Sequence, residues 1–161
     1  MKRILIILAI TLGSFCSADA QKVYREILSL SEKVAKDKSK DLQTRKIATF
    51  KVDELKYMAM KTGEAMPDSS VTVLDNQAYA MYEFVNLYVK KLSEAKTKKN
   101  KELILDIFKS ASIQNPRFND MDLDLVEAYI RNDGYITSFS LDTDWQKAVA
   151  QARSELRKRG M

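Results

Sequence analysis

The sequence has no histidine, and its single cysteine is Cys16. Without these residue types the chain cannot build a Ser-His-Asp or a Cys-His catalytic group. Zinc, copper and haem sites ligated by imidazole or thiolate are excluded for the same reason once Cys16 is removed. A lone cysteine also leaves no internal disulfide. The chemistry that remains available is that of carboxylates, hydroxyls and lysine amines.

Glycine and proline are also scarce, with four and two residues respectively. No glycine-rich phosphate loop and no dinucleotide-binding glycine motif occurs, so we expect no cofactor. A long apolar run is absent as well. The longest, residues 4–12, is far shorter than the roughly 20 residues that span a bilayer, so we expect no transmembrane helix in the mature chain.

This short apolar run has the form of a secretory signal. Lys2 and Arg3 precede it, and Ala18-Asp19-Ala20 offers small residues at the two positions that a signal peptidase reads. We therefore predict a signal peptide over residues 1–20 and a mature chain over 21–161, exported to the periplasm or the extracellular space.

Cys16 leaves a second interpretation of the leader open. A cysteine near the end of a signal can accept lipid in bacterial lipoproteins, but Phe15 is a bulky residue where that motif wants a small one. We therefore favour cleavage before Gln21 over lipid anchoring through Cys16.

Apolar residues after the leader recur at helical spacing of three and four positions. This pattern predicts an all-α fold, with residues 21–161 forming a single domain, a bundle of five or six mostly antiparallel amphipathic helices. Two stretches, Val71-Thr72-Val73-Leu74 and residues 135–141, are rich enough in β-branched and aromatic residues to be extended instead. The helical segments are 23–34, 48–59, 78–92, 103–111, 125–130 and 145–156.

The pattern also predicts a capping box and a core. Thr143-Asp144-Trp145-Gln146 has the sequence in which a threonine hydroxyl and a glutamine amide cap a helix start. Glu83 is an acid within the most apolar segment, so we predict that burial perturbs its carboxyl group. The residues predicted to form the core are Trp145, Tyr82, Val85, Val89, Phe108, Ile107, Val126 and Val149.

Basic residues form three clusters that could bind an anionic surface. Most such clusters are solvated helix faces supported by acid–base pairs at i, i+4. The formal net charge of +5 is modest, which argues against nucleic acid as a partner. The clusters are Lys33, Lys36, Lys38 and Lys40, then Lys96, Lys98, Lys99 and Lys101, then Arg153, Arg157, Lys158 and Arg159.

Two other groups are candidate binding sites. Asp120, Asp122, Asp124 and Glu127 could ligate calcium or magnesium through oxygen, but the glycine and glutamate of an EF-hand loop are missing, and acids at a helix start stabilise its macrodipole. The second group is aromatic and could line a ligand groove, although tyrosines at helical spacing are usually core. It comprises Tyr57, Tyr79, Tyr82 and Tyr88.

From these features we expect a non-catalytic exported helical protein that acts through protein or ligand binding, with no assigned catalytic, cofactor-binding or metal-binding residue. One alternative is a binder of polysaccharide or lipid head groups through the Lys/Arg clusters. The other is a hydrolase with paired carboxylates, for which no spacing singles out a pair. Because histidine is absent, we also expect the free energy of unfolding to be nearly constant between about pH 6 and 8.

Overall fold

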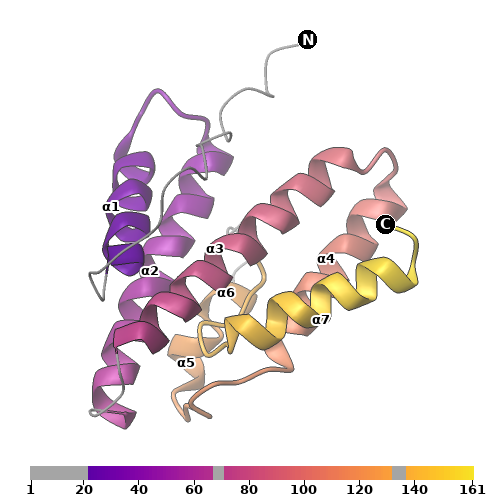
Figure 1. The fold of residues 1–161 in the computed structure, drawn as a ribbon. Coiled ribbons are helices and arrows are strands. Elements are labelled where there is room, and N and C mark those ends of the chain that lie inside the picture. Colours follow the sequence, from indigo (N-terminus) through magenta and orange to yellow (C-terminus); the bar gives the residue numbers. More distant parts are fainter. Residues whose placement is uncertain (1–21, 67–70, 132–136) are drawn as a thin grey trace.

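The computed structural model describes residues 22–66, 71–131 and 137–161, and all regular secondary structure within them is helical (Figure 1). The predicted all-α class is therefore confirmed. The leader that we predict over residues 1–20 lies outside the described part. The helices are α1 (Lys22–Lys36), α2 (Leu42–Ala65), α3 (Val71–Glu94), α4 (Lys98–Ile113), α5 (Leu123–Val126), α6 (Ala128–Arg131) and α7 (Trp145–Lys158).

The long helices form two antiparallel hairpins that share a core (Figure 1). One hairpin is α1 and α2. The other is α3 and α4, against which α7 packs, so that the end of α7 lies near the turn between α3 and α4. The connection from α4 to α7 carries α5 and α6 and reaches α2 through two ring contacts, Phe118 with Tyr57 and Tyr129 with Phe50.

The described residues contain seven helices, so the expectation of five or six is wrong. The predicted segment 125–130 is divided into α5 and α6, each a single turn. At Glu127 the backbone leaves the helical region, with φ −99° and ψ 7°. Val126 and Tyr129, one on each short helix, are nevertheless both buried. Hydrophobic periodicity found the buried residues here but not the break between them.

The capping residues explain where several helices begin. The carboxylates of Asp41, Asp122 and Asp144 accept backbone N–H groups at the starts of α2, α5 and α7, and Thr97 does so for α4. These bonds satisfy donors that a helix start leaves free. The predicted capping box is therefore one residue early, because Asp144 and not Thr143 is the cap of α7.

The two stretches that could have been strands have different outcomes. Residues 71–74 form the first turn of α3. Of the second stretch, residues 135 and 136 lie outside the described part, and 137–141 have no regular secondary structure. Thr137, Phe139 and Leu141 are buried, so in this connection the aromatic and branched residues indicate burial and not a sheet.

An aromatic cluster fills the centre of the bundle. Phe84 meets Phe108, Phe139 and Trp145 in edge-to-face contacts with centroids 5.0–5.2 Å apart, a geometry that such rings favour. Six predicted core residues are buried, namely Trp145, Val85, Phe108, Ile107, Val126 and Val149. Two predictions were wrong, because Val89 is 40% exposed and Tyr82 is half-buried.

Within residues 22–66, 71–131 and 137–161, none of the helices combines the length and the apolar character needed to cross a membrane.

Candidate functional site

The most unusual polar group of the molecule is Glu54, on the inner face of α2. Its side chain is fully buried, and its Oε1 accepts a hydrogen bond of 2.7 Å from Nε1 of Trp145. Its Oε2 is buried and has no hydrogen-bond partner among the residues that the structure describes. Burial raises the pKa of the Glu54 carboxyl well above its ordinary value, and the charge of Asp142 raises it further, against the effect of the Trp145 bond. Burial therefore favours the neutral, protonated form of Glu54.

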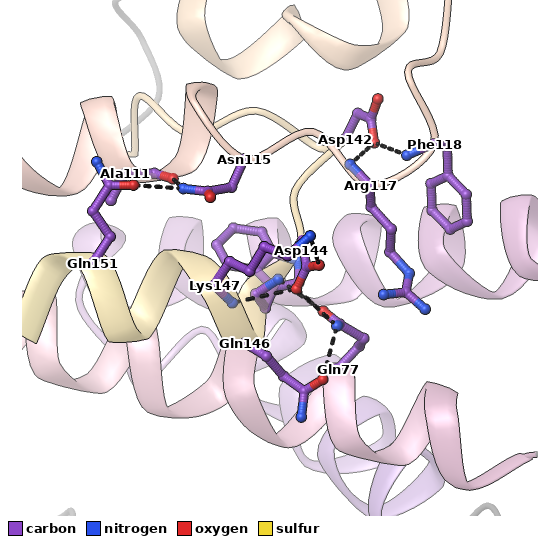
Figure 2. A network of polar contacts seen from close by, with 11 residues as sticks. Gln77, Ala111, Asn115, Arg117, Phe118, Asp142, Asp144, Gln146, Lys147 and Gln151 are labelled. Carbon is purple, nitrogen blue, oxygen red and sulfur yellow. Dashed lines mark hydrogen bonds and ion pairs between the residues drawn. The ribbon is translucent and has the colours of Figure 1, made fainter.

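Asp142 organises the connection that follows α4. Its Oδ1 accepts the backbone N–H groups of Arg117 and Phe118 at 2.9 and 2.8 Å, as Figure 2 shows. Its Oδ2 accepts the N–H of Asp120 at 2.9 Å. The side chain is buried, and each of its oxygens is engaged by the backbone. These bonds explain how a loop can be anchored here without a strand or a disulfide.

Tyr57 joins Asp120 to the same region. Its hydroxyl donates to Oδ2 of Asp120 at 3.0 Å, and Nζ of Lys61 lies 3.1 Å from the same oxygen. Although partial burial raises the pKa of Asp120, hydrogen bonds from Asp122, Lys61 and Tyr57 outweigh it and hold that pKa below its ordinary value. Burial and the charge of Asp142 raise the pKa of the Tyr57 phenol. Tyr57 therefore acts as a hydrogen-bond donor between charged neighbours.

A second network fixes the start of α7 (Figure 2). The buried amide of Gln77 donates to Oδ1 of Asp144 at 3.1 Å and accepts the backbone N–H of Trp145 at 2.7 Å. Asp144 in turn caps α7 and pairs with Lys147 at 3.1 Å. This network sets the position of the Trp145 ring, which then reaches Glu54.

These acids resemble the pair that a hydrolase needs, since one carboxyl has a raised pKa and another carboxylate lies nearby. Their surroundings differ from those of a catalytic pair, however. Glu54 is fully buried and Asp142 is 5% exposed, and both surface hollows described below are lined by other residues. In the described part of the chain, no three acids are grouped so as to hold a metal ion. The arrangement can anchor backbone and position Trp145.

The acids singled out from the sequence have separate partners. Asp122 caps α5, and Asp124 and Glu127 both pair with Arg131. The prediction that Glu83 is buried is wrong. Its side chain is 31% exposed and pairs with Arg153 at 3.2 Å. Glu83 lies beside the buried face of α3, because the inner positions of this turn are taken by Phe84 and Val85. The buried acid is Glu54, on a different helix.

The four tyrosines do not share one surface. Tyr57 and Tyr88 are buried, whereas Tyr79 is 42% exposed and Tyr82 is half-buried. Tyr82 instead contacts Lys51, whose Nζ lies 4.5 Å from the ring centroid and donates to Asn86 at 3.1 Å. Burial lowers the pKa of Lys51 to about 8. A buried lysine is expected to pair with an acid. The contacts of Lys51 are instead an aromatic ring and a side-chain amide.

Two of the three basic clusters meet at one end of the bundle. The first turn of α4 and the last turns of α7 lie at the same end because these helices are antiparallel (Figure 1). The cluster at the turn between α1 and α2 belongs to the other hairpin and lies apart from them. We call the joined clusters the basic end: Lys96, Lys98, Lys99, Lys101, Arg153, Arg157, Lys158 and Arg159.

A surface hollow of about 260 Å³ opens beside the basic end, between α3 and α7. Its lining combines three apolar residues with three cations. Lys91 and Arg153 each have one acidic partner, Glu94 and Glu83, while Arg157 has none among the described residues. We call this the α3–α7 hollow, lined by Leu87, Lys91, Arg153, Leu156, Arg157 and Met161.

The other hollow described, of about 410 Å³, lies on the outer side of α1 and is lined by Arg25, Glu26, Ser29 and Leu30. It carries one charge of each sign and belongs to a single helix.

Sequence analysis missed both Glu54 and the α3–α7 hollow. A signal for Glu54 was available, since it lies between the apolar residues Val52 and Leu55 of the same helical segment. No comparable signal existed for the hollow, because its residues come from two helices separated by more than 60 positions. Comparisons of the chain with protein-family models, with curated proteins and with solved structures found no match.

Proposed function

We propose that the protein is an exported, non-catalytic helical binding protein whose basic end engages an anionic partner. The observation that carries the proposal is the meeting of two basic clusters, distant in sequence, beside an open hollow at one end of the bundle. Complementary charge of this kind guides association and fixes orientation. The third cluster, at the turn between α1 and α2, is not part of this surface.

The lysines at the start of α4 support the proposal because their charges destabilise the helix on which they lie. Lys98, Lys99 and Lys101 stand in the first turn of α4, which has no acidic residue. Cations at a helix N-terminus oppose the macrodipole, and each such interaction amounts to about 0.3–1 kcal/mol. Lys98 has an acidic partner four residues later, Glu102 at 3.7 Å, but Lys99 and Lys101 have none among the described residues, so helix stability does not account for these two. The basic residues at the end of α7, by contrast, do favour their own helix.

The buried carboxylates support a non-catalytic role. The oxygens of Asp142 accept three backbone N–H groups, and Glu54 is fully buried with its Oε1 bonded to the indole of Trp145. A general acid must reach the atom that it protonates, and these groups face the interior. Export rests on the leader alone, namely the basic residues, the apolar run and the cleavage motif that ends at Ala20.

The test compares two charge reversals of equal size. One variant carries Lys98→Glu, Lys99→Glu and Lys101→Glu at the basic end. The other carries Lys33→Glu, Lys36→Glu and Lys38→Glu on the other hairpin, so that net charge is matched. Binding to immobilised polyglutamate, to heparin and to anionic vesicles is measured from 50 to 300 mM salt.

We expect the wild type to bind at least one of these probes at low salt, the basic-end variant to lose that binding, and the matched variant to keep it. Equal losses in both variants would show a response to net charge alone and would refute the proposal. So would an absence of binding to all three probes at 50 mM salt, where exposed charges interact most strongly.

A further inference from the structure

The α3–α7 hollow owes its shape to the way α7 ends. Gly160 has a φ of +66°, which glycine adopts without strain. This turn directs the N–H of Met161 to the carbonyl oxygen of Leu156 at 3.0 Å and the N–H of Gly160 to that of Arg157 at 3.1 Å. The pair of bonds is a Schellman motif, in which the last apolar residue packs back on the helix. Met161 therefore lines the hollow together with Leu156.

The charges around this apolar floor come from both helices. Lys91 projects from α3, and Arg153 and Arg157 project from α7. The acids that pair with Lys91 and Arg153 are themselves partly exposed, Glu94 at 50% and Glu83 at 31%, so an incoming carboxylate can replace them at little cost. Arg157 is exposed and has no acidic partner in the described part of the chain. The rim therefore has capacity for at least one further negative group.

The size of the hollow limits what it can take. Pockets for small molecules usually hold about 300–1,000 Å³ and enclose most of their ligand. A volume of about 260 Å³ that opens to the surface suits a single large side chain from a partner. Protein interfaces are commonly anchored in this way, by one apolar side chain in a pocket with charged groups around it.

A lipid surface fits the same features less well. Proteins that lie on a membrane present apolar side chains that project into it beside their basic residues. Here the turn between α3 and α4 spans residues 95–97 and leads into Lys98 and Lys99, while Leu87, Leu156 and Met161 line the recess.

We propose that the α3–α7 hollow binds an acidic peptide segment of a partner protein, with one large apolar side chain of that segment in the hollow and its carboxylates on Lys91, Arg153 and Arg157. The inference rests on the proposed function and names its partner class. The hollow should therefore prefer acidic peptides that carry a large apolar residue, because a peptide without that residue keeps only the charge contacts of the rim.

The experiment uses two labelled acidic peptides with capped ends that differ only in a central Leu or Ser. Fluorescence anisotropy gives their affinities for the wild type and for variants whose folding is checked by circular dichroism. Burying most of a leucine side chain is worth about tenfold or more in affinity. We therefore expect the wild type to prefer the Leu peptide about tenfold.

Three variants separate the contributions. Met161→Ser removes part of the floor and should reduce the preference for Leu to about twofold without changing the charge. Arg157→Glu should weaken both peptides by at least fivefold, and Lys38→Glu on the other hairpin should leave both within twofold of the wild type.

Equal affinity of the wild type for the two peptides would overturn the hollow as an anchor site while leaving anion binding by the basic end intact. Binding to vesicles or heparin with no binding to either peptide would also overturn it, in favour of lipid or polysaccharide. Failure of every anionic probe to bind would overturn this inference together with the proposed function.

Discussion

Glu54 offers the sharpest test of the buried polar network, because it predicts a pH dependence of an uncommon sign. In the unfolded chain the Glu54 carboxyl has its ordinary pKa of about 4.5, and in the native state burial raises that pKa well above it. Between these two values the native state holds one proton more than the unfolded state. The free energy of unfolding must then fall as the pH rises through this window.

The size of this pH effect follows from the one additional proton that the native state holds on Glu54. The limiting slope is about 1.4 kcal/mol per pH unit for as long as native Glu54 stays protonated and unfolded Glu54 is ionised. The carboxyl groups with lowered pKa, such as Asp120 and Asp144, act below their ordinary value of 3.8 and add no slope above pH 5. The absence of histidine predicts near-constant stability between pH 6 and 8, and a slope from Glu54 that extends into this range would contradict that prediction.

The assay is urea denaturation at pH 5, 6 and 7 of the wild type, Glu54→Gln and Glu83→Gln. Glutamine can still accept the Trp145 hydrogen bond at its Oε1 but cannot titrate, so Glu54→Gln should remove the slope. Absolute stability is not the readout, because an added amide donor can itself cost about 1–3 kcal/mol when buried without a partner. Glu83→Gln is the control, since Glu83 is partly exposed and paired with Arg153. Parallel curves for the wild type and Glu54→Gln would refute the reasoning.

The remaining predictions concern the core, the end of α7, the buried lysine and the leader. Phe108→Ala should lower the free energy of unfolding by about 3–5 kcal/mol in urea denaturation, because the ring is fully buried; a loss below about 1 kcal/mol would contradict its burial. Gly160→Ala should cost about 1 kcal/mol in the same assay, since the φ of +66° strains any side chain; an unchanged midpoint would contradict that turn. Between pH 8 and 10.5, Lys51 binds fewer protons in the native state than in the unfolded chain, so the free energy of unfolding should rise across that window by up to about 3 kcal/mol. Lys51→Met should abolish this rise in denaturation curves measured over the same pH range. Intact mass spectrometry of the exported protein should give a chain that begins at Gln21, and a mass that begins at an acylated Cys16 would contradict this cleavage site.

Periodicity was enough to predict the fold class and most of the core. The stripes that contain Val85, Phe108 and Trp145 repeat at helical spacing, and these residues are buried. It failed for Val89, which follows the same spacing near the end of α3 but is 40% exposed, although the adjacent Tyr88 is buried. A pattern within one helix carries no information on which of its apolar positions a neighbouring helix covers.

The candidate sites were less accessible to sequence reasoning. Glu54 was overlooked in favour of Glu83 because the two acids have similar apolar neighbours, and only the tertiary contact with Trp145 distinguishes them. The basic clusters were recognised, but which two of them lie together depends on the antiparallel packing of α4 and α7. The α3–α7 hollow forms only where these two helices pack together, so it could not have been predicted from the sequence of either helix.

The hydrogen bond between Trp145 and Glu54 joins residues that are 91 positions apart, and the one between Trp145 and Gln77 spans 68. Contacts of such long range form late, because a large loop must close before they contribute any energy. The hairpin of α1 and α2 can assemble from local contacts as soon as its own residues are available. The aromatic centre cannot, since the indole that completes it enters with the last helix. A chain shortened before residue 145 should therefore retain helices without a fixed core, and docking of α7 should be the step that sets the folding rate.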